Sequence, residues 1–158
     1  MADEPNEAQL AAWRAFLRAH ATVVDRLDHE LQRDEDLPLT WYEVLLHLGL
    51  APEHRLRLSG LADRLLLSRS GLTRLVDRME EAGLIEREVC RSDRRGAFAV
   101  LTEEGLARFR RAAPVHLRGV HQHFSGLLTD EEVEAVRSGM EKVAGPWGAD
   151  RPGASENC

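Results

Sequence analysis

The fold is decided by one stretch of sequence, Ser68-Arg69-Ser70-Gly71-Leu72-Thr73-Arg74-Leu75-Val76-Asp77-Arg78-Met79-Glu80-Glu81-Ala82-Gly83. Its apolar residues recur at i, i+3, i+4 and i+7, which predicts a helix with one buried face. Ser68 is suited to cap the start of this helix, and Gly83 is suited to follow its end. The opposite face carries arginines and short hydroxyls, which can bond base edges or phosphates in a DNA major groove. The candidate DNA contacts on this helix are Ser68, Arg69, Ser70, Thr73, Arg74 and Arg78.

After Gly83 the helical periodicity gives way to alternation, which predicts two strands, Leu84–Cys90 and Ala97–Leu101. The polar turn between them ends in a glycine, as a hairpin requires. A recognition helix followed directly by a hairpin is a winged helix in outline. Arg94 and Arg95 at the hairpin tip are candidates for the minor groove or the neighbouring phosphates. Arg87 can reach a phosphate or pair with a neighbouring glutamate.

The residues before the recognition helix complete a helix-turn-helix. Leu56–Leu58 is a candidate strand, and Ser59 is expected to cap a short helix that ends near Leu65. A tight connection then leads into Ser68. Further upstream, Thr40 and Glu43 have the spacing of a capping box, which predicts the start of another short helix at that point.

Long amphipathic helices flank this module. Asn6 to Arg33 reads as one helix of about 40 Å, longer than a small domain needs, so part of its apolar side is expected to meet a second copy of the chain. Thr102 is suited to cap a helix that Pro114 should bend, and Thr129 with Glu132 forms a capping box for a last helix. The expected fold is mainly α with a small β-hairpin. It places a winged helix-turn-helix at 38–102, a helical dimerisation region at 6–37 and 103–144, and a mobile tail at 145–158.

Composition excludes several classes of protein. Apolar residues make up 43% of the 158 residues and charged residues 30%, which is normal for a globular domain. No apolar run is long enough to span a membrane, and the acidic N-terminus does not resemble a signal peptide. Two cysteines, Cys90 and Cys158, do not make a disulfide framework. We therefore expect a cytoplasmic protein.

The net charge of −6 is unevenly distributed. Residues 51–111 carry 13 basic and 10 acidic side chains, whereas residues 1–50 and 112–158 are both net acidic. The only positive segment is therefore the one that holds the predicted helix and hairpin. A local positive field steers DNA association more than the global charge does.

These motifs, taken together, resemble the MarR family of bacterial transcriptional regulators. The resemblance rests on Asp93-Arg94-Arg95, similar to the family's D-x-R wing, on the strand end and helix start at 100–105, and on Leu61-Ala62-Asp63 and 70–87. It implies a homodimer in which the first and last helices pair and each winged helix reads half of a pseudo-palindrome in double-stranded DNA. It also implies a repressor released by a small, often aromatic or phenolic ligand. The chain departs from the family's peroxide-sensing branch, because no cysteine precedes Cys90.

Other sites have weaker support in the sequence. Trp13, His20, Trp41 and Tyr42 are candidates to line a ligand pocket beside the first two helices. The histidines at 116, 121 and 123 lack the spacing of a metal site, so no metal or other cofactor is predicted. No enzyme motif occurs. The alternatives are a winged-helix protein-interaction module without DNA affinity and a metal-responsive regulator.

Overall fold

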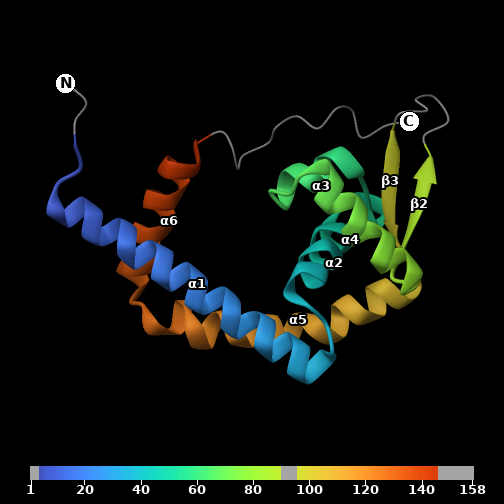
Figure 1. The fold of residues 1–158 in the computed structure, drawn as a ribbon. Helices are drawn as coiled ribbons and strands as arrows, with labels where there is room; N and C mark the ends of the chain where they lie inside the picture. Colours follow the sequence, from blue (N-terminus) through green and yellow to red (C-terminus); the bar gives the residue numbers. More distant parts are fainter. Residues whose placement is uncertain (1–3, 90–95, 146–158) are drawn as a thin grey trace.

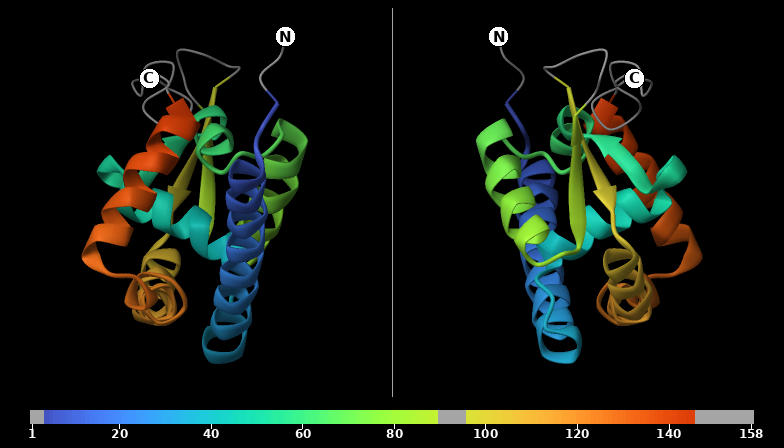
Figure 2. Two further views of the ribbon diagram at one scale, coloured as in Figure 1. Left: turned by 90° about the vertical axis from the view of Figure 1, so that its left-hand side faces the viewer. Right: turned by 90° about the vertical axis from the view of Figure 1, so that its right-hand side faces the viewer.

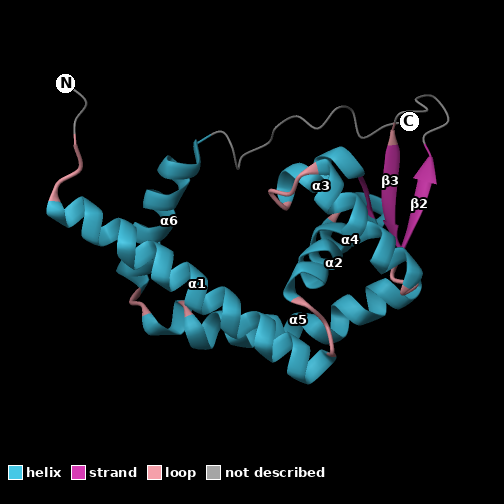
Figure 3. Ribbon diagram, viewed as in Figure 1, coloured by secondary structure: helices cyan, strands magenta, loops and turns pink. Residues whose placement is uncertain are grey.

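The computed structural model describes residues 4–89 and 96–145, and within them the chain is mainly helical (Figure 1, Figure 3). The predicted fold class is confirmed: helices surround one small antiparallel sheet. In chain order the elements are α1 (Glu7–Glu35), α2 (Leu39–Leu50), η1 (Pro52–His54), β1 (Arg55–Arg57), α3 (Leu58–Arg64), α4 (Arg69–Glu81), β2 (Ile85–Val89), β3 (Ala97–Leu101), α5 (Glu103–His123), η2 (Ser125–Leu127) and α6 (Asp130–Ala144).

Helix α5 joins the two parts of the molecule (Figure 1). Its first turns lie beneath α2, α4 and the sheet, and its later turns run along α1. Helix α6 rises from the far end of α5, and none of its residues is buried (Figure 2). Helix α5 continues through Pro114 without interruption. The winged helix is therefore attached to a helical region whose outer side is largely uncovered.

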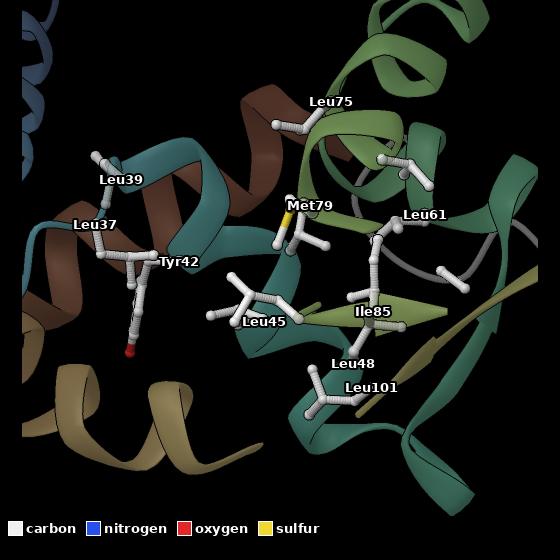
Figure 4. Close-up of a cluster of buried hydrophobic side chains, with 14 of the residues drawn as sticks. Leu37, Leu39, Tyr42, Leu45, Leu48, Leu61, Leu75, Met79, Ile85 and Leu101 are labelled. Atoms are coloured by element: carbon white, nitrogen blue, oxygen red, sulfur yellow. The ribbon is translucent and has the colours of Figure 1, made fainter. Parts of the chain in front are cut away.

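The core is centred on α2, whose apolar side chains meet α4, α5 and the sheet (Figure 4). Val44, Leu45 and Leu48 are completely buried, as is Met79 of α4. Because α2 is apolar around most of its circumference, it can be covered on several sides at once. It thus fixes α4 relative to the sheet and to α5.

The sheet has the strand order β1-β3-β2, and both pairings are antiparallel. The hairpin of β2 and β3 confirms the prediction from alternation. The strand expected at Leu56–Leu58 exists but occupies Arg55–Arg57, because Leu58 already belongs to α3. Its pairing with β3 closes the sheet on the side away from β2.

Two predicted helix caps are wrong. α2 begins at Leu39, after Pro38, so Thr40 lies inside the first turn and does not cap the helix. The amide of Leu39 donates instead to the carboxylate of Asp28, at 2.7 Å, so an α1 side chain takes the capping role. α3 follows β1 without a linker, which places Ser59 inside that helix rather than at its start.

Other predicted helix ends are confirmed. The hydroxyl of Thr102 accepts a hydrogen bond from the Gly105 amide at 3.0 Å, at the start of α5. Thr129 and Glu132 form the predicted capping box of α6. The division into a winged helix and a dimerisation region stays a prediction, and of the predicted tail at 145–158 all but the first residue lies outside the described residues.

Candidate nucleic-acid interface

Helix α4 has the predicted caps and the predicted buried stripe. The Ser68 hydroxyl accepts a hydrogen bond from the Gly71 amide at 3.1 Å, and Gly83 ends the helix with φ +73°. This φ favours glycine, because an L side chain would be strained there. The apolar stripe is buried at Leu72, Leu75, Val76 and Met79. Burial of one face leaves the polar face of α4 open along the whole helix.

Helix α3 and the turn at 65–68 hold α4 in place. Leu61 and Ala62 of α3 belong to the core, and the Leu67 amide donates back to the Ala62 carbonyl at 3.0 Å. Leu66 in the turn has a positive φ of 54° and is 72% exposed. The two helices and their tight connection form the predicted helix-turn-helix.

The predicted contact residues of α4 lie together on its exposed face. They are Ser68, Arg69, Ser70, Thr73, Arg74 and Arg78, and each is exposed. Within the described residues Arg69 and Arg78 form no ion pair, and Arg74 donates only to the Ser70 carbonyl, at 3.4 Å. Gly71, Arg74, Asp77 and Arg78 line an open depression on this side of the helix. Cations without carboxylate partners on such a surface can bind phosphates or guanine edges.

The hydroxyls on this face are partly engaged. Thr73 donates its hydroxyl hydrogen to the Arg69 carbonyl at 2.8 Å, and the Ser68 and Ser70 hydroxyl oxygens lie 3.3 Å apart. A hydroxyl that donates to its own helix keeps its acceptor lone pairs. Thr73 is therefore oriented to accept a hydrogen bond, such as one from an adenine or cytosine amino group.

Arg87 of β2 lies at the edge of this exposed face and is paired with carboxylates of α4. Its guanidinium forms ion pairs with Asp77 and Glu80 of α4. The sequence offered a phosphate or a neighbouring glutamate as its partner, and the structure places it against the recognition helix. Burial lowers the pKa of Arg87, but hydrogen bonds and charge from the two carboxylates outweigh burial and raise it overall.

The hairpin tip, with Arg94 and Arg95, lies outside the described residues, so those two contacts stay predictions. Two other arginines, Arg55 and Arg57 of β1, were not among the predicted contacts. The guanidiniums of Arg55 and Arg57 lie 4.3 Å and 5.2 Å from the ring centroid of Phe98. The alternation Arg-Leu-Arg was the available signal, because it puts both arginines on one face of a strand.

The four aromatic and histidine candidates do not form one cluster. Trp13 and His20 are exposed on α1, and Phe16 lies between them, with ring centroids 5.8 Å and 6.2 Å away. Tyr42 is buried in α2, and its ring lies 4.4 Å from that of His116 on α5. Trp41 is half-buried against the core.

Burial shifts the pKa values of both Tyr42 on α2 and His116 on α5, whose rings are in contact. It raises the pKa of Tyr42 and lowers the pKa of His116. In the part of the chain that the structure describes, His116 Nδ1 is buried without a hydrogen-bond partner. No group of three or more metal-ligating side chains occurs among the described residues, and none of their helices is long and apolar enough to cross a membrane.

Comparison with known proteins gives a consistent result. A model of the MarR family matches residues 35–96. AbsC, a MarR family regulator from Streptomyces coelicolor, is 37% identical, with 89% of this chain and 95% of AbsC covered and a TM-score of 0.84. Sco3205 of the same organism and family, solved in complex with DNA, is 38% identical over 89% of this chain and 92% of its own, also with a TM-score of 0.84.

A further structure is that of CouR from Rhodococcus jostii RHA1 bound to p-coumaroyl-CoA. It is 27% identical over 84% of this chain and 90% of CouR, with a TM-score of 0.72. The family model spans α2, the helix-turn-helix and β2 and ends just before β3, and the likeness to AbsC and Sco3205 extends over 89% of the chain. This chain therefore belongs to the MarR family of transcriptional regulators.

Proposed function

We propose that this protein binds a pseudo-palindromic operator as a homodimer and represses transcription until a small ligand releases it. The observation that carries the DNA-binding step is the exposed face of α4, where arginines lie without carboxylate partners among the described residues. The DNA complex of Sco3205, a relative 38% identical, supports the same use of the fold. In a helix-turn-helix protein the second helix enters the major groove, which assigns base contacts to Ser70, Thr73 and Arg74.

The homodimer is supported by apolar surface on the helical region. α6 is amphipathic, yet Val136, Met140 and Val143 are exposed. Trp13 and Leu17 on α1 are exposed as well. Apolar faces of this extent mark association surfaces, and a two-fold pairing of like helices would bury them. A dimer also presents two α4 helices to one side of the duplex.

Selection of bound duplexes from a random-sequence pool tests this proposal. The wild-type protein should enrich two inverted half-sites about 10 base pairs apart, centre to centre, because successive major grooves on one side of the duplex have that spacing. Enrichment of a single half-site would contradict the dimeric reading. Failure to retain any duplex at low salt would contradict DNA binding and favour a protein-interaction module.

Ligand release is supported by CouR, whose structure holds p-coumaroyl-CoA. In this chain the candidate ligand residues fall in two places, Trp13 and His20 on the outer side of α1, and Trp41 and Tyr42 on α2. The second place adjoins α5, which connects directly to the winged helix. We assign the ligand to the α2 position, where Tyr42 and His116 offer polar groups among apolar side chains.

Titration of the operator complex with p-coumarate and p-coumaroyl-CoA tests the ligand step. Release of the duplex by either compound, weakened by Tyr42→Phe, would support it. A reporter gene downstream of the operator tests repression, since deletion of the regulator should raise expression. Lower expression on deletion would make the protein an activator.

A further inference from the structure

Arg87 joins the wing to the recognition helix through four contacts. Its guanidinium forms ion pairs with Asp77 and Glu80, and its Nη2 also lies 3.4 Å from the Thr73 carbonyl oxygen. Its backbone amide donates to Glu80 Oε1 at 3.1 Å. Asp77 lies 10 residues and Glu80 lies 7 residues before Arg87 in sequence, across the turn at Gly83. One side chain of β2 therefore reaches three residues of α4.

The three partners form a single stripe along α4. Positions 73, 77 and 80 are spaced i, i+4 and i+7, so they lie on one side of the helix over two turns. Across the sheet, Arg87 pairs with Ala99, and Leu56 pairs with the same residue on its other side. Paired residues share a face, and Leu56 and Ala99 are buried. Arg87 thus extends from the inner face of the sheet toward α4, where its side chain is partly buried.

The charge around Arg87 makes it unsuited to a phosphate contact. One guanidinium faces two carboxylates, so the cluster carries a net negative charge, which repels the DNA backbone. Both terminal nitrogens already donate to α4. Arg69 and Arg78 differ, since among the described residues neither has a carboxylate partner.

We propose that Arg87 is a positioning residue that holds the recognition helix and the wing in one fixed relative orientation, and that it does not itself contact DNA. The inference rests on the proposed DNA binding and names the residue that sets its geometry. Besides this cluster, α4 and β2 are connected by the short turn at 82–84 and by the core that they share, in which Met79 and Ile85 are buried. The planar fork of arginine can engage two carboxylates at once, which ties two turns of the helix to the strand. The two DNA-contacting elements then bind as one rigid unit.

Four variants separate positioning from DNA contact: Arg87→Met, Arg87→Lys, Asp77→Asn and Glu80→Gln. Arg137→Met is the matched control, because Arg137 on α6 also pairs with two carboxylates, Glu134 and Glu141. Each protein is titrated against the duplex that the wild type selects and against a random-sequence duplex of equal length, at several salt concentrations. Thermal unfolding of each variant gives the folded fraction, by which the affinities are corrected.

Positioning predicts that Arg87→Met lowers the ratio of operator to random-duplex affinity about tenfold, within the range of couplings between contacting residues. The salt dependence should stay unchanged, because no phosphate contact is lost. Asp77→Asn and Glu80→Gln should lower the same ratio although they remove negative charge. Arg87→Lys should lower it as well, since an ammonium cannot bridge both carboxylates in a planar fork. Arg137→Met should leave it unchanged.

Three results would overturn the inference. If Arg87→Met reduced the salt slope by about 0.9 for each copy, Arg87 would be a phosphate contact. If Asp77→Asn or Glu80→Gln raised operator affinity selectively, the carboxylates would be competing with DNA for Arg87. If all ratios matched the wild type after correction for folding, the cluster would only stabilise the fold. A wild-type protein with no preferred duplex would instead refute the proposed function, and the positioning role with it.

Discussion

Replacing Arg74 with alanine tests the recognition helix most directly. Arg74 is exposed, and its one described hydrogen bond is to the Ser70 carbonyl at 3.4 Å. Alanine and arginine have similar helix propensities, so the free energy of unfolding should change by no more than about 0.5 kcal/mol. Any larger effect on DNA binding must then come from the lost guanidinium.

The size of that effect follows from the number of copies. A bidentate contact with guanine contributes about 1–3 kcal/mol, so two copies in a dimer contribute about 2–6 kcal/mol. Operator affinity should fall between about 30-fold and about 20,000-fold. If Arg74 binds a phosphate, the loss will be the same for all sequences, and the slope of log affinity against log salt will fall by about 1.8 for two contacts.

Fluorescence anisotropy with a labelled operator duplex measures both quantities at several salt concentrations. Arg110→Ala is the control, because Arg110 is an exposed arginine on α5, outside the helix-turn-helix. Operator affinity equal to the wild type at every salt concentration would refute the assignment of α4 as the recognition helix. A change in thermal stability beyond that of the control would show that Arg74 also supports the fold.

Three further substitutions test other parts of the molecule. Val136→Asp with Met140→Asp should give folded monomers in sedimentation, because neither side chain is buried in the subunit; a persistent dimer would exclude α6 from the interface. Arg94→Ala with Arg95→Ala should flatten the salt dependence of operator binding, and an unchanged slope would remove the wing tip from the complex. For His116 the folded pKa lies below its ordinary 6.5, so the unfolded chain takes up the proton first and stability falls as pH drops below that value. His116→Phe should lessen this loss in chemical denaturation at pH 7 and pH 5.5, and an equal loss in both proteins would contradict the assignment.

The recognition helix could be predicted from the sequence because everything that defines it is local. Leu72, Leu75, Val76 and Met79 set its buried face within 8 residues, and Ser68 and Gly83 mark its ends. The rest of the fold only supplies the apolar surfaces against which this helix packs. The start of α2 could not be predicted from local sequence, because its cap is Asp28, 11 residues before Leu39 and in another helix.

Arg87 shows a different reason for incomplete prediction. Alternation along the strand placed the residue in β2 but did not say which face of the sheet it shares with its neighbours. That choice is set by the register with β3, where Arg87 lies opposite Ala99. Once the face is fixed, the guanidinium of Arg87 meets the carboxylates of Asp77 and Glu80 on α4. The ion pairs between Arg87 of β2 and the carboxylates of α4 are therefore visible only in the three-dimensional structure.

The candidate ligand residues were grouped in the sequence because Trp13, His20, Trp41 and Tyr42 all belong to the first two helices. In the structure the exposed pair follows the outer side of α1, whereas Tyr42 contacts His116 of α5. Helical periodicity cannot separate these groups, because an apolar stripe looks the same whether its own subunit or a second one covers it. The outer pair thus fits a dimer surface better than a pocket.

Helix α5 is the element through which the proposed ligand would act on the DNA-binding surface. At its start the Thr102 hydroxyl donates to the Gly83 carbonyl at 2.7 Å, directly after α4. Gly105 packs so closely there that an added Cβ would lie 2.0 Å from the Leu84 carbonyl oxygen. At its other end, His123 Nε2 lies 2.6 Å from Glu30 of α1. Because the first turn of α5 has no space in which to slide past the end of α4, a ligand that shifts α5 against α1 must move the recognition helix with it. Two recognition helices on one duplex tolerate little change in separation, so such a shift would weaken operator binding without altering any contact residue.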